Sequence, residues 1–308
     1  MMDWSRGPFM NKLRIVVALI TEDNDFQQEQ ASVAMTTARK YGMDVNIIYA
    51  ENDGVNQSLQ LVQLIQAAKD SHPDAIVVEP VGTGMTQVAQ AAAAAGIGWV
   101  ILNRHVDYLG ALRRKNSAPM FSVSTNNRAV GQIQGEQFNA LAPSNGALLY
   151  LEGPSLTDTA QDRRLGMLET KREDITVKTL RGDWTEASGY QAMKSWLRLP
   201  TSKELNVKVV GCQNDSMAIG ARKAIEDHDN MQEREKLLRL PFTGCDGLPS
   251  KGQTFVHQGM LKATVMTPPL TARALEMLAG ALSSGKQPPE DSLVEPDSYP
   301  AVSKLRAV

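Results

Sequence analysis

The segment Val207-Lys208-Val209-Val210-Gly211-Cys212-Gln213-Asn214-Asp215-Ser216-Met217-Ala218-Ile219-Gly220-Ala221 decides the fold class of this chain. Its first half is a β-branched apolar run typical of a buried strand, and its second half has the apolar spacing of a helix. A second string, Thr243-Gly244-Cys245-Asp246-Gly247, also places a carboxylate directly after such a strand. Because ligands of parallel α/β sheets bind beyond the carboxyl ends of the strands, both strings are typical of a binding site.

Apolar runs and helical periodicities alternate along the rest of the chain. The runs that predict strands lie at 14–20, 44–50, 75–78, 99–102, 121–124, 147–152, 176–180, 207–212, 240–245 and 261–266. The patterns that predict helices lie at 26–41, 57–71, 85–95, 129–141, 162–171, 187–197, 217–227 and 271–284. Continuous apolar strands between helices are typical of parallel sheets covered on both faces. The sequence therefore predicts an α/β protein with two doubly wound lobes.

Length and charge limit the classes of partner. At 308 residues the chain is longer than one ordinary domain, which favours two compact units. The chain has 32 Lys and Arg residues and 34 Asp and Glu residues, which gives a net charge of -2. It therefore lacks the excess of positive charge that binding to a nucleic-acid phosphate backbone requires. The longest apolar stretches are too short to span a bilayer. We expect neither nucleic-acid binding nor membrane insertion.

Cysteine and histidine usage argues against a metal site. Cys212 and Cys245 are the two cysteines, each at the end of a predicted strand, and we interpret them as buried thiols rather than a redox or metal pair. The four histidines are scattered without metal-ligand spacing. We therefore expect no metal and no cofactor.

Three segments fall outside the alternating pattern. Residues Met1–Lys12 contain no continuous apolar region and show no export signal. The charged segment Glu226–Arg239 is interpreted as a solvated helical extension. The proline-rich tail from Gln287 is expected to run extended over the surface or between the lobes, as a strap rather than a domain.

Five local strings, in this order, resemble the type I periplasmic sugar-binding proteins, whose members bind ribose, galactose, xylose and related sugars. The resemblance covers about residues 13–308, and the strings are Thr21–Phe26, Asn103-Arg104, Asp162–Gly166, Asn214–Ala221, and Gly244–Gly247 followed by Gly259–Val265.

The resemblance implies two lobes joined by crossings near Ser124, Thr267 and Leu293. The N-terminal lobe would comprise 11–124 and 268–293, and the C-terminal lobe 125–267 and 294–308. A ligand cleft would lie between them and close by a hinge. The resemblance further implies a periplasmic monomer that delivers a sugar or polyol to an ABC transporter permease or a chemoreceptor.

In the first lobe the resemblance assigns the ligand to Asn24, Phe26, Asn103 and Arg104. Family members commonly have Asp-Arg at the last two positions, so Asn103 is a weaker acceptor. The alternatives are a turn for Asn24, core packing for Phe26 and a surface ion pair for Arg104.

In the second lobe the resemblance points to Gln161 and Arg163 at the start of a helix, where relatives carry ligand-binding Arg residues. Arg163 has an internal salt bridge as its alternative. Trp184 lies in a loop after a strand, where the family often places an aromatic ring that stacks on the sugar.

Three further positions complete the implied site. Asn214 is expected to contact the ligand while Asp215 caps the following helix. Asp246 would accept sugar hydroxyls, with an Asp-Gly turn as its alternative. Thr267 stands at the second crossing, where ribose binders have a Gln. The departures at Asn103, Gln161 and Thr267 argue against ribose itself.

Two other classes of protein stay open at this point. A cytoplasmic sugar-sensing effector module fits the missing export signal, although Met1–Lys12 is too short for the helix-turn-helix of the related repressors. A nucleotide-dependent enzyme is supported by Gly82-Thr83-Gly84 alone, which lacks the rest of the dinucleotide fingerprint. We therefore expect a non-catalytic binding protein.

Overall fold

The computed structural model describes residues 12–142 and 145–307, which divide into two compact units. The first unit runs up to Ser124 and includes Pro269–Leu293, and the second comprises Thr125–Pro268 and the chain from Val294. Position 268, which we expected in the first lobe, thus belongs to the second unit. The expectations about Met1–Lys12 concern, apart from Lys12, residues outside the described ranges.

The first unit is built on one mainly parallel sheet. Among the described residues its strands are, in spatial order, β11 (Asp291–Val294), β5 (Met120–Thr125), β4 (Gly98–Leu102), β3 (Ala75–Val78), β1 (Arg14–Leu19) and β2 (Asp44–Tyr49). Its helices are α1 (Asp25–Tyr41), α2 (Gly54–Gln66), α3 (Thr86–Ala94), α4 (Leu109–Arg113) and α12 (Leu270–Ser284), with a 3-10 turn at Lys69–Ser71. Strands β1 to β5 pair in parallel. The strand order reverses at β1, which lies between β2 and β3. This is a doubly wound sheet, as predicted.

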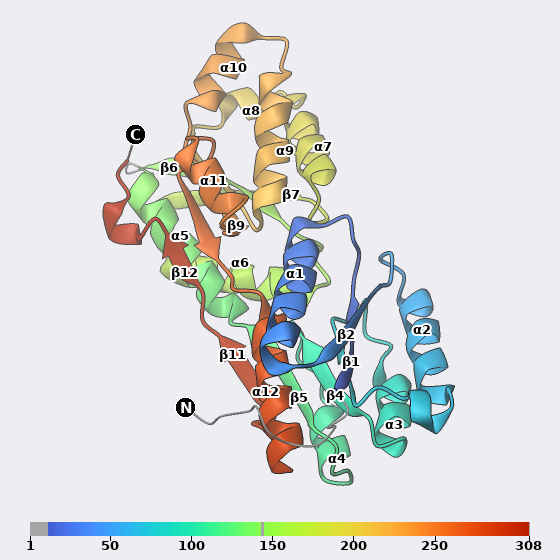
Figure 1. Ribbon diagram of the computed structural model, residues 1–308. Helices are drawn as coiled ribbons and strands as arrows, with labels where there is room; N and C mark the ends of the chain where they lie inside the picture. The colour runs from blue at the N-terminus through green and yellow to red at the C-terminus, as the bar shows by residue number, and fades with distance from the viewer. Residues whose placement is uncertain (1–11, 143–144, 308) are drawn as a thin grey trace. The chain divides into compact units, whose positions relative to one another are not determined.

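Helices cover both faces of this sheet because its strands are apolar on both sides. Val16 and Ala18 of β1 pack in one cluster with Leu61 of α2 and Ala89 of α3. Helices α1 and α12 lie side by side on the opposite face (Figure 1), where Thr271 donates to the main-chain oxygen of Gln30.

The second unit repeats the plan. Its strands are, in spatial order among the described residues, β12 (Asp297–Tyr299), β10 (Ala263–Met266), β9 (Phe242–Asp246), β8 (Val207–Cys212), β6 (Gly146–Glu152) and β7 (Ile175–Arg181). Its helices are α5 (Asn127–Leu141), α6 (Asp158–Thr170), α7 (Glu186–Leu197), α8 (Thr201–Glu204), α9 (Asp215–Glu226), α10 (Met231–Leu238) and α11 (Gly252–His257), with a 3-10 turn at Val302–Lys304. Here the order reverses beside β6, and β12 alone among the paired strands described runs antiparallel.

Alternate residues of β6 supply the two cores of the second unit. Leu149 and Leu151 join the cluster that contains Met217 of α9, whereas Leu148 and Tyr150 join the cluster that contains Phe138 of α5. The period of two along a strand directs successive side chains to opposite faces.

Glycines let the covering helices approach each other closely. A Cβ at Gly220 in α9 would overlap the carbonyl oxygen of Glu186 at the start of α7, and one at Gly166 in α6 would overlap that of Arg128 in α5. Only a residue without a side chain fits at these crossings. In Figure 1, α5 lies beside α6, and α7 lies beside α9.

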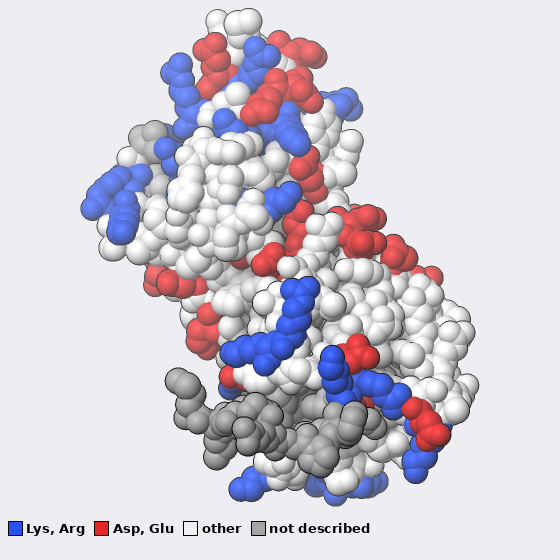
Figure 2. Space-filling model, viewed as in Figure 1, with Lys and Arg blue, Asp and Glu red and all other residues white. Residues whose placement is uncertain are grey.

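The C-terminal tail differs from the expected strap because it supplies strands to both sheets, β11 beside β5 and β12 beside β10. The charged segment contains α10, of which no residue is buried. Figure 2 shows acidic and basic side chains interspersed over this end of the unit. Among the described residues, no helix has the length and apolar character needed to span a bilayer.

Candidate functional site

Polar side chains meet at the carboxyl ends of β1, β3 and β4 in the first unit. Gln27 lies in the first turn of α1, Glu79 directly follows β3, and Asn103 and Arg104 directly follow β4. We call these four residues the Glu79 cluster. They lie beside the place where the strand order reverses, which is where doubly wound sheets bind ligands.

Glu79 is the charged centre of this cluster and is only 4% exposed. Its Oε2 accepts a hydrogen bond from Gln27 Nε2 at 2.8 Å, and its Oε1 accepts one from Asn103 Nδ2 at 3.1 Å. Burial raises the pKa of the Glu79 carboxyl, while the two amides and the Arg104 guanidinium act in the opposite direction. Sequence analysis missed Glu79, although it follows strand β3 as Asn103 follows β4.

The other expected residues of the first unit have partly structural roles. Asn24 caps α1, because its Oδ1 accepts from the main-chain nitrogens of Phe26 at 2.9 Å and Gln27 at 3.2 Å. Phe26 is half-buried in the first turn of that helix. Arg104 donates from Nε to the main-chain oxygen of Pro80 at 3.1 Å, so its guanidinium is tied to the loop after β3.

In the second unit a buried arginine organises the corresponding edge. Arg163 of α6 is 5% exposed and donates from Nε to Asn127 Oδ1 at 3.0 Å and from Nη1 to the main-chain oxygen of Gln213. Its guanidinium lies 5.7 Å from the centroid of the Trp184 ring. We call Asn127, Arg163, Trp184, Gln213 and Asn214 the Arg163 cluster. Both of these acceptors are neutral oxygens, so neutral hydrogen bonds rather than the salt bridge considered as an alternative hold Arg163 within the described part of the chain.

The expectation that Asp215 caps the following helix is wrong, because Asn214 takes that role. Asn214 is the N-cap of α9: its Oδ1 accepts from the main-chain nitrogen of Met217 at 2.9 Å, and its Nδ2 donates to the main-chain oxygen of Trp184 at 2.7 Å. Asp215 is instead the first residue of the helix. Its carboxylate does not cap the helix. It accepts hydrogen bonds from donors far away in the sequence, one on β10 and one in the loop after β9.

Those donors connect Asp215 to the loop that carries Asp246. Asp215 Oδ2 accepts from the main-chain nitrogen of Gly247 at 2.9 Å, and Oδ1 accepts from Thr264 Oγ1 at 2.7 Å. Burial, and then the nearby Asp246 carboxylate, raise the pKa of Asp215 well above its usual range. Asp246 has a φ of 102°, a strained conformation for a residue with a side chain.

Trp184 also has an unusual backbone, with a φ of 72°. A bulky residue in this region costs roughly 1–3 kcal/mol, and such strain often marks a functional position. The Trp184 side chain packs on the core of the second unit and leaves no room for a Cβ at Gly153.

Thr267 is hydrogen-bonded to Asp246 at the carboxyl end of β9, whereas Gln161 is bonded to a loop residue before α6. Thr267 donates its main-chain N–H to the main-chain oxygen of Asp246 at 3.0 Å. Its hydroxyl oxygen is buried, with no hydrogen-bond partner among the described residues. Gln161 is exposed, and its Nε2 donates to the main-chain oxygen of Ser155 at 2.9 Å. No described contact joins Gln161 to the Arg163 cluster.

Gln213 and Asn127 are further residues that sequence analysis missed. Gln213 is fully buried, and its Oε1 accepts from the main-chain nitrogen of Gly153 at 2.9 Å, which joins the ends of β6 and β8. Gln213 immediately precedes Asn214 in the sequence. Asn127 gave no local signal, because its contact with Arg163 spans 36 residues.

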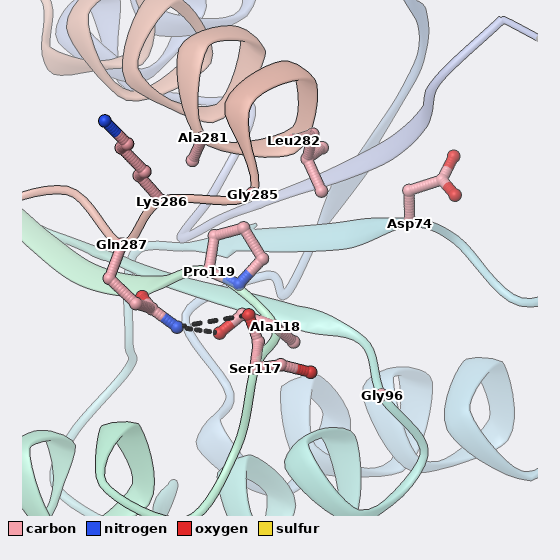
Figure 3. A pocket seen from close by; sticks show the side chains of 10 residues that line it. All are labelled: Asp74, Gly96, Ser117, Ala118, Pro119, Ala281, Leu282, Gly285, Lys286 and Gln287. Carbon is pink, nitrogen blue, oxygen red and sulfur yellow. Dashed lines mark hydrogen bonds between the residues drawn. The ribbon is translucent and has the colours of Figure 1, made fainter.

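Two hollows are lined by residues outside these clusters. One, of about 180 Å³, is lined by the residues before β3, β4 and β5 and by the end of α12; there Gln287 Nε2 donates to the main-chain oxygens of Ser117 and Ala118 (Figure 3). The other is an open groove of about 680 Å³ along β7 and α7. None of the expected site residues lines either hollow.

Metal chemistry finds no support in the donor groups. Among residues 12–142 and 145–307, no group of three or more His, Cys, Asp or Glu side chains is arranged to hold a metal ion. Cys212 and Cys245 are free and buried, as expected. Burial raises the pKa of both thiols, that of Cys245 to about 12, so neither is a reactive thiolate at neutral pH.

Two doubly wound units with polar clusters at the carboxyl ends of their strands define a class of binding protein. The family model of the periplasmic binding protein domain matches residues 15–287. The chain belongs to this family, as the sequence resemblance indicated.

Curated relatives cover nearly the whole chain. The D-allose-binding periplasmic protein of Escherichia coli (strain K12) is 26% identical over 287 residues, which is 91% of this chain and 88% of that protein. The galactofuranose-binding protein of the same organism is 24% identical and covers 93% of this chain and 87% of its own. A solved periplasmic solute-binding protein from Actinobacillus succinogenes 130z, with bound D-allose, has a TM-score of 0.79 at 23% identity, covering 93% of this chain and 97% of that one. This last likeness confirms the fold class.

Proposed function

We propose that this chain is a non-catalytic binding protein for a small sugar or polyol. The arrangement of Arg163, Trp184, Asn214 and Asp246 at one edge of a parallel sheet carries the proposal. They bring together a guanidinium, an indole ring, an amide and a carboxylate. Sugar hydroxyls both donate and accept hydrogen bonds, and the ring presents an apolar C–H face, so this mixture suits such a ligand.

The ligand is proposed to contact the Glu79 cluster as well as the Arg163 cluster. Each cluster lies where the strand order of its own sheet reverses, and the curated relatives named above bind sugars. A ligand that contacts both units binds a closed arrangement more tightly than an open one, and so shifts the population toward closure. The closed form would then deliver its ligand to an ABC transporter permease or a receptor in the periplasm, the compartment that the name of the D-allose-binding relative gives.

Isothermal titration calorimetry against a panel of pentoses, hexoses and polyols tests the proposal. We expect one or a few members to bind with micromolar or lower Kd, equivalent to about 8 kcal/mol or more. Small-angle scattering of the saturated protein should show a smaller radius of gyration than the free protein. If no member of the panel binds, the proposed function is wrong.

A matched pair of variants locates the site. Asp246→Asn removes the charged acceptor while keeping the size of the side chain, and we expect it to weaken binding of the tightest panel member at least tenfold. Asp229→Asn makes the same chemical change at an exposed position after α9 and should leave the Kd unchanged. Equal Kd values for the two variants would remove Asp246 from the site.

A further inference from the structure

The amide of Asn103 is held in one orientation by its neighbour Glu79. Asn103 Nδ2 donates to Glu79 Oε1 over 3.1 Å, and Oε1 is an acceptor that the NH₂ of the amide, but not its oxygen, can satisfy. The Asn103 backbone is also held, because its N–H donates to the main-chain oxygen of Val123 at 2.9 Å. Its φ of 57° is one that Asn adopts more readily than most residues. The amide oxygen therefore points away from Glu79.

That oxygen is a buried acceptor with no hydrogen-bond partner among residues 12–142 and 145–307. Buried polar atoms in native proteins are usually paired, and an orphaned one at a ligand-binding edge indicates a partner supplied by the ligand. Asn103 Oδ1 thus offers a lone pair to a hydroxyl donor.

The amide of Gln27 is also held in one orientation. Its Oε1 accepts from the main-chain nitrogen of Ile20 at 3.1 Å, so its Nε2 is the group that faces Glu79. Glu79 consequently receives donors from two directions, both from oriented amides. The Asn103 amide can rotate by 180° without breaking a hydrogen bond at its oxygen, because that oxygen has no partner among the described residues. Rotation of the Gln27 amide would break the hydrogen bond from Ile20.

We propose that Glu79 is a positioning residue that makes Asn103 a hydrogen-bond acceptor toward the ligand, and so selects a hydroxyl that donates at this point. The inference rests on the proposed function. Glu79 would supply the carboxylate that orients the amide, and Asn103 would supply the oxygen that accepts from the ligand. The inference also means that an Asp at position 103 would be unfavourable here, because two carboxylates would face each other.

Exchange of the two chemical groups tests the proposal. In Glu79→Gln, the new amide oxygen accepts from Gln27, and its NH₂ faces Asn103, which must turn over and present a donor instead of an acceptor. In Asn103→Asp, the new carboxylate opposes Glu79. In the double variant Glu79→Gln/Asn103→Asp, Gln donates to Asp, and the free Asp oxygen again faces outward as an acceptor. The wild type and the double variant have the same net charge.

The probe is the panel member with the lowest Kd for the wild type. We expect each single variant to raise that Kd at least tenfold and the double variant to return it to within about threefold of the wild-type value. A role that depended on the charge of Glu79 itself would not produce this return, because the double variant carries a neutral side chain at position 79. An unchanged Kd in Glu79→Gln, or a double variant weaker than both single variants, would overturn the proposal.

Thermal unfolding separates this inference from the proposed function. The one charged group that acts on the Glu79 carboxylate in the described cluster is Arg104, and the remaining contacts are the neutral amides of Gln27 and Asn103. Asn103→Asp should lower the Tm more at pH 7 than at pH 5, since protonation relieves the repulsion, and the double variant should regain most of the loss. If no sugar binds but the Tm values follow this pattern, the proposed function fails while the orientation of Asn103 stands. If the double variant regains nothing, the orientation itself is wrong.

Discussion

The main-chain nitrogen of Gly247 donates to Asp215 Oδ2 over 2.9 Å, and this bond anchors the residue that follows Asp246. The Asp215 carboxylate is enclosed so closely that a Cβ at Gly244 or Gly252 would overlap its oxygens. Asp246 keeps its strained φ of 102° beside this anchor. Asp215 therefore supports a neighbouring strand and loop rather than the end of its own helix.

Asp215→Asn should make the stability of the protein less dependent on pH. Because the folded-state pKa of Asp215 is raised above its unfolded value near 4, the folded protein binds the proton more tightly, and stability falls as pH rises above about 4. The limiting slope for one proton is about 1.4 kcal/mol per pH unit. Urea unfolding at pH 4.5 and pH 7 should show a smaller loss for Asp215→Asn than for the wild type.

The exposed variant Asp229→Asn serves as the control for this measurement, and its pH profile should run parallel to that of the wild type. Parallel profiles for Asp215→Asn as well would show that Asp215 does not retain its proton above pH 4.

The two roles of Asn214 can be separated by substitution. Asn214→Ser keeps a capping oxygen for Met217 but loses the donor to Trp184, whereas Asn214→Ala loses both. We expect Asn214→Ala to cost about 1–2 kcal/mol of unfolding free energy and Asn214→Ser less than about 1 kcal/mol. Denaturant unfolding gives both values, and near-ultraviolet circular dichroism should show a changed Trp184 environment in both. Equal costs would mean that the cap contributes nothing.

Close contact between α7 and α9 predicts opposite effects of the same substitution at two helical glycines. Gly220→Ala would place a methyl group against Glu186 and 2.8 Å from the nitrogen of Tyr190, so we expect a loss of about 1–3 kcal/mol. Gly280→Ala in α12 meets no atom within 4 Å and should add about 0.5–1 kcal/mol through helix propensity. Melting curves of the two variants provide the comparison, and a stabilised Gly220→Ala would contradict the close packing.

The sequence predicted the parts of the fold that local pattern determines. Strands β3 and β8 lie where the apolar runs placed them, because a continuous apolar run between helices has few other solutions. Strand β11 was missed, since it is short and half polar and pairs with β5 across more than 160 residues.

The site shows the same limit. Local sequence offers both Asn214 and Asp215 as caps, and the choice between them is made by Gly247 and Thr264, 32 and 49 residues away. Glu79 escaped notice because its partners lie 52 and 24 residues from it. Which donors reach a carboxylate depends on strand order rather than on local spacing.

Arg163→Lys tests whether the geometry of the guanidinium, rather than its charge, prepares the site for the ligand. Lysine keeps the positive charge but cannot bond Asn127 and Gln213 at once in the fixed fork that arginine provides, nor stack its plane on Trp184. We expect calorimetry to show at least a tenfold weaker Kd for the tightest panel member, about 1.4 kcal/mol, at unchanged net charge. Arg128→Lys, which changes an exposed arginine of the neighbouring α5 that pairs with Glu169 of α6, should bind like the wild type. If Arg163→Lys binds the ligand as tightly as the wild type, then Arg163 contributes to affinity through its charge and not through the geometry of its guanidinium.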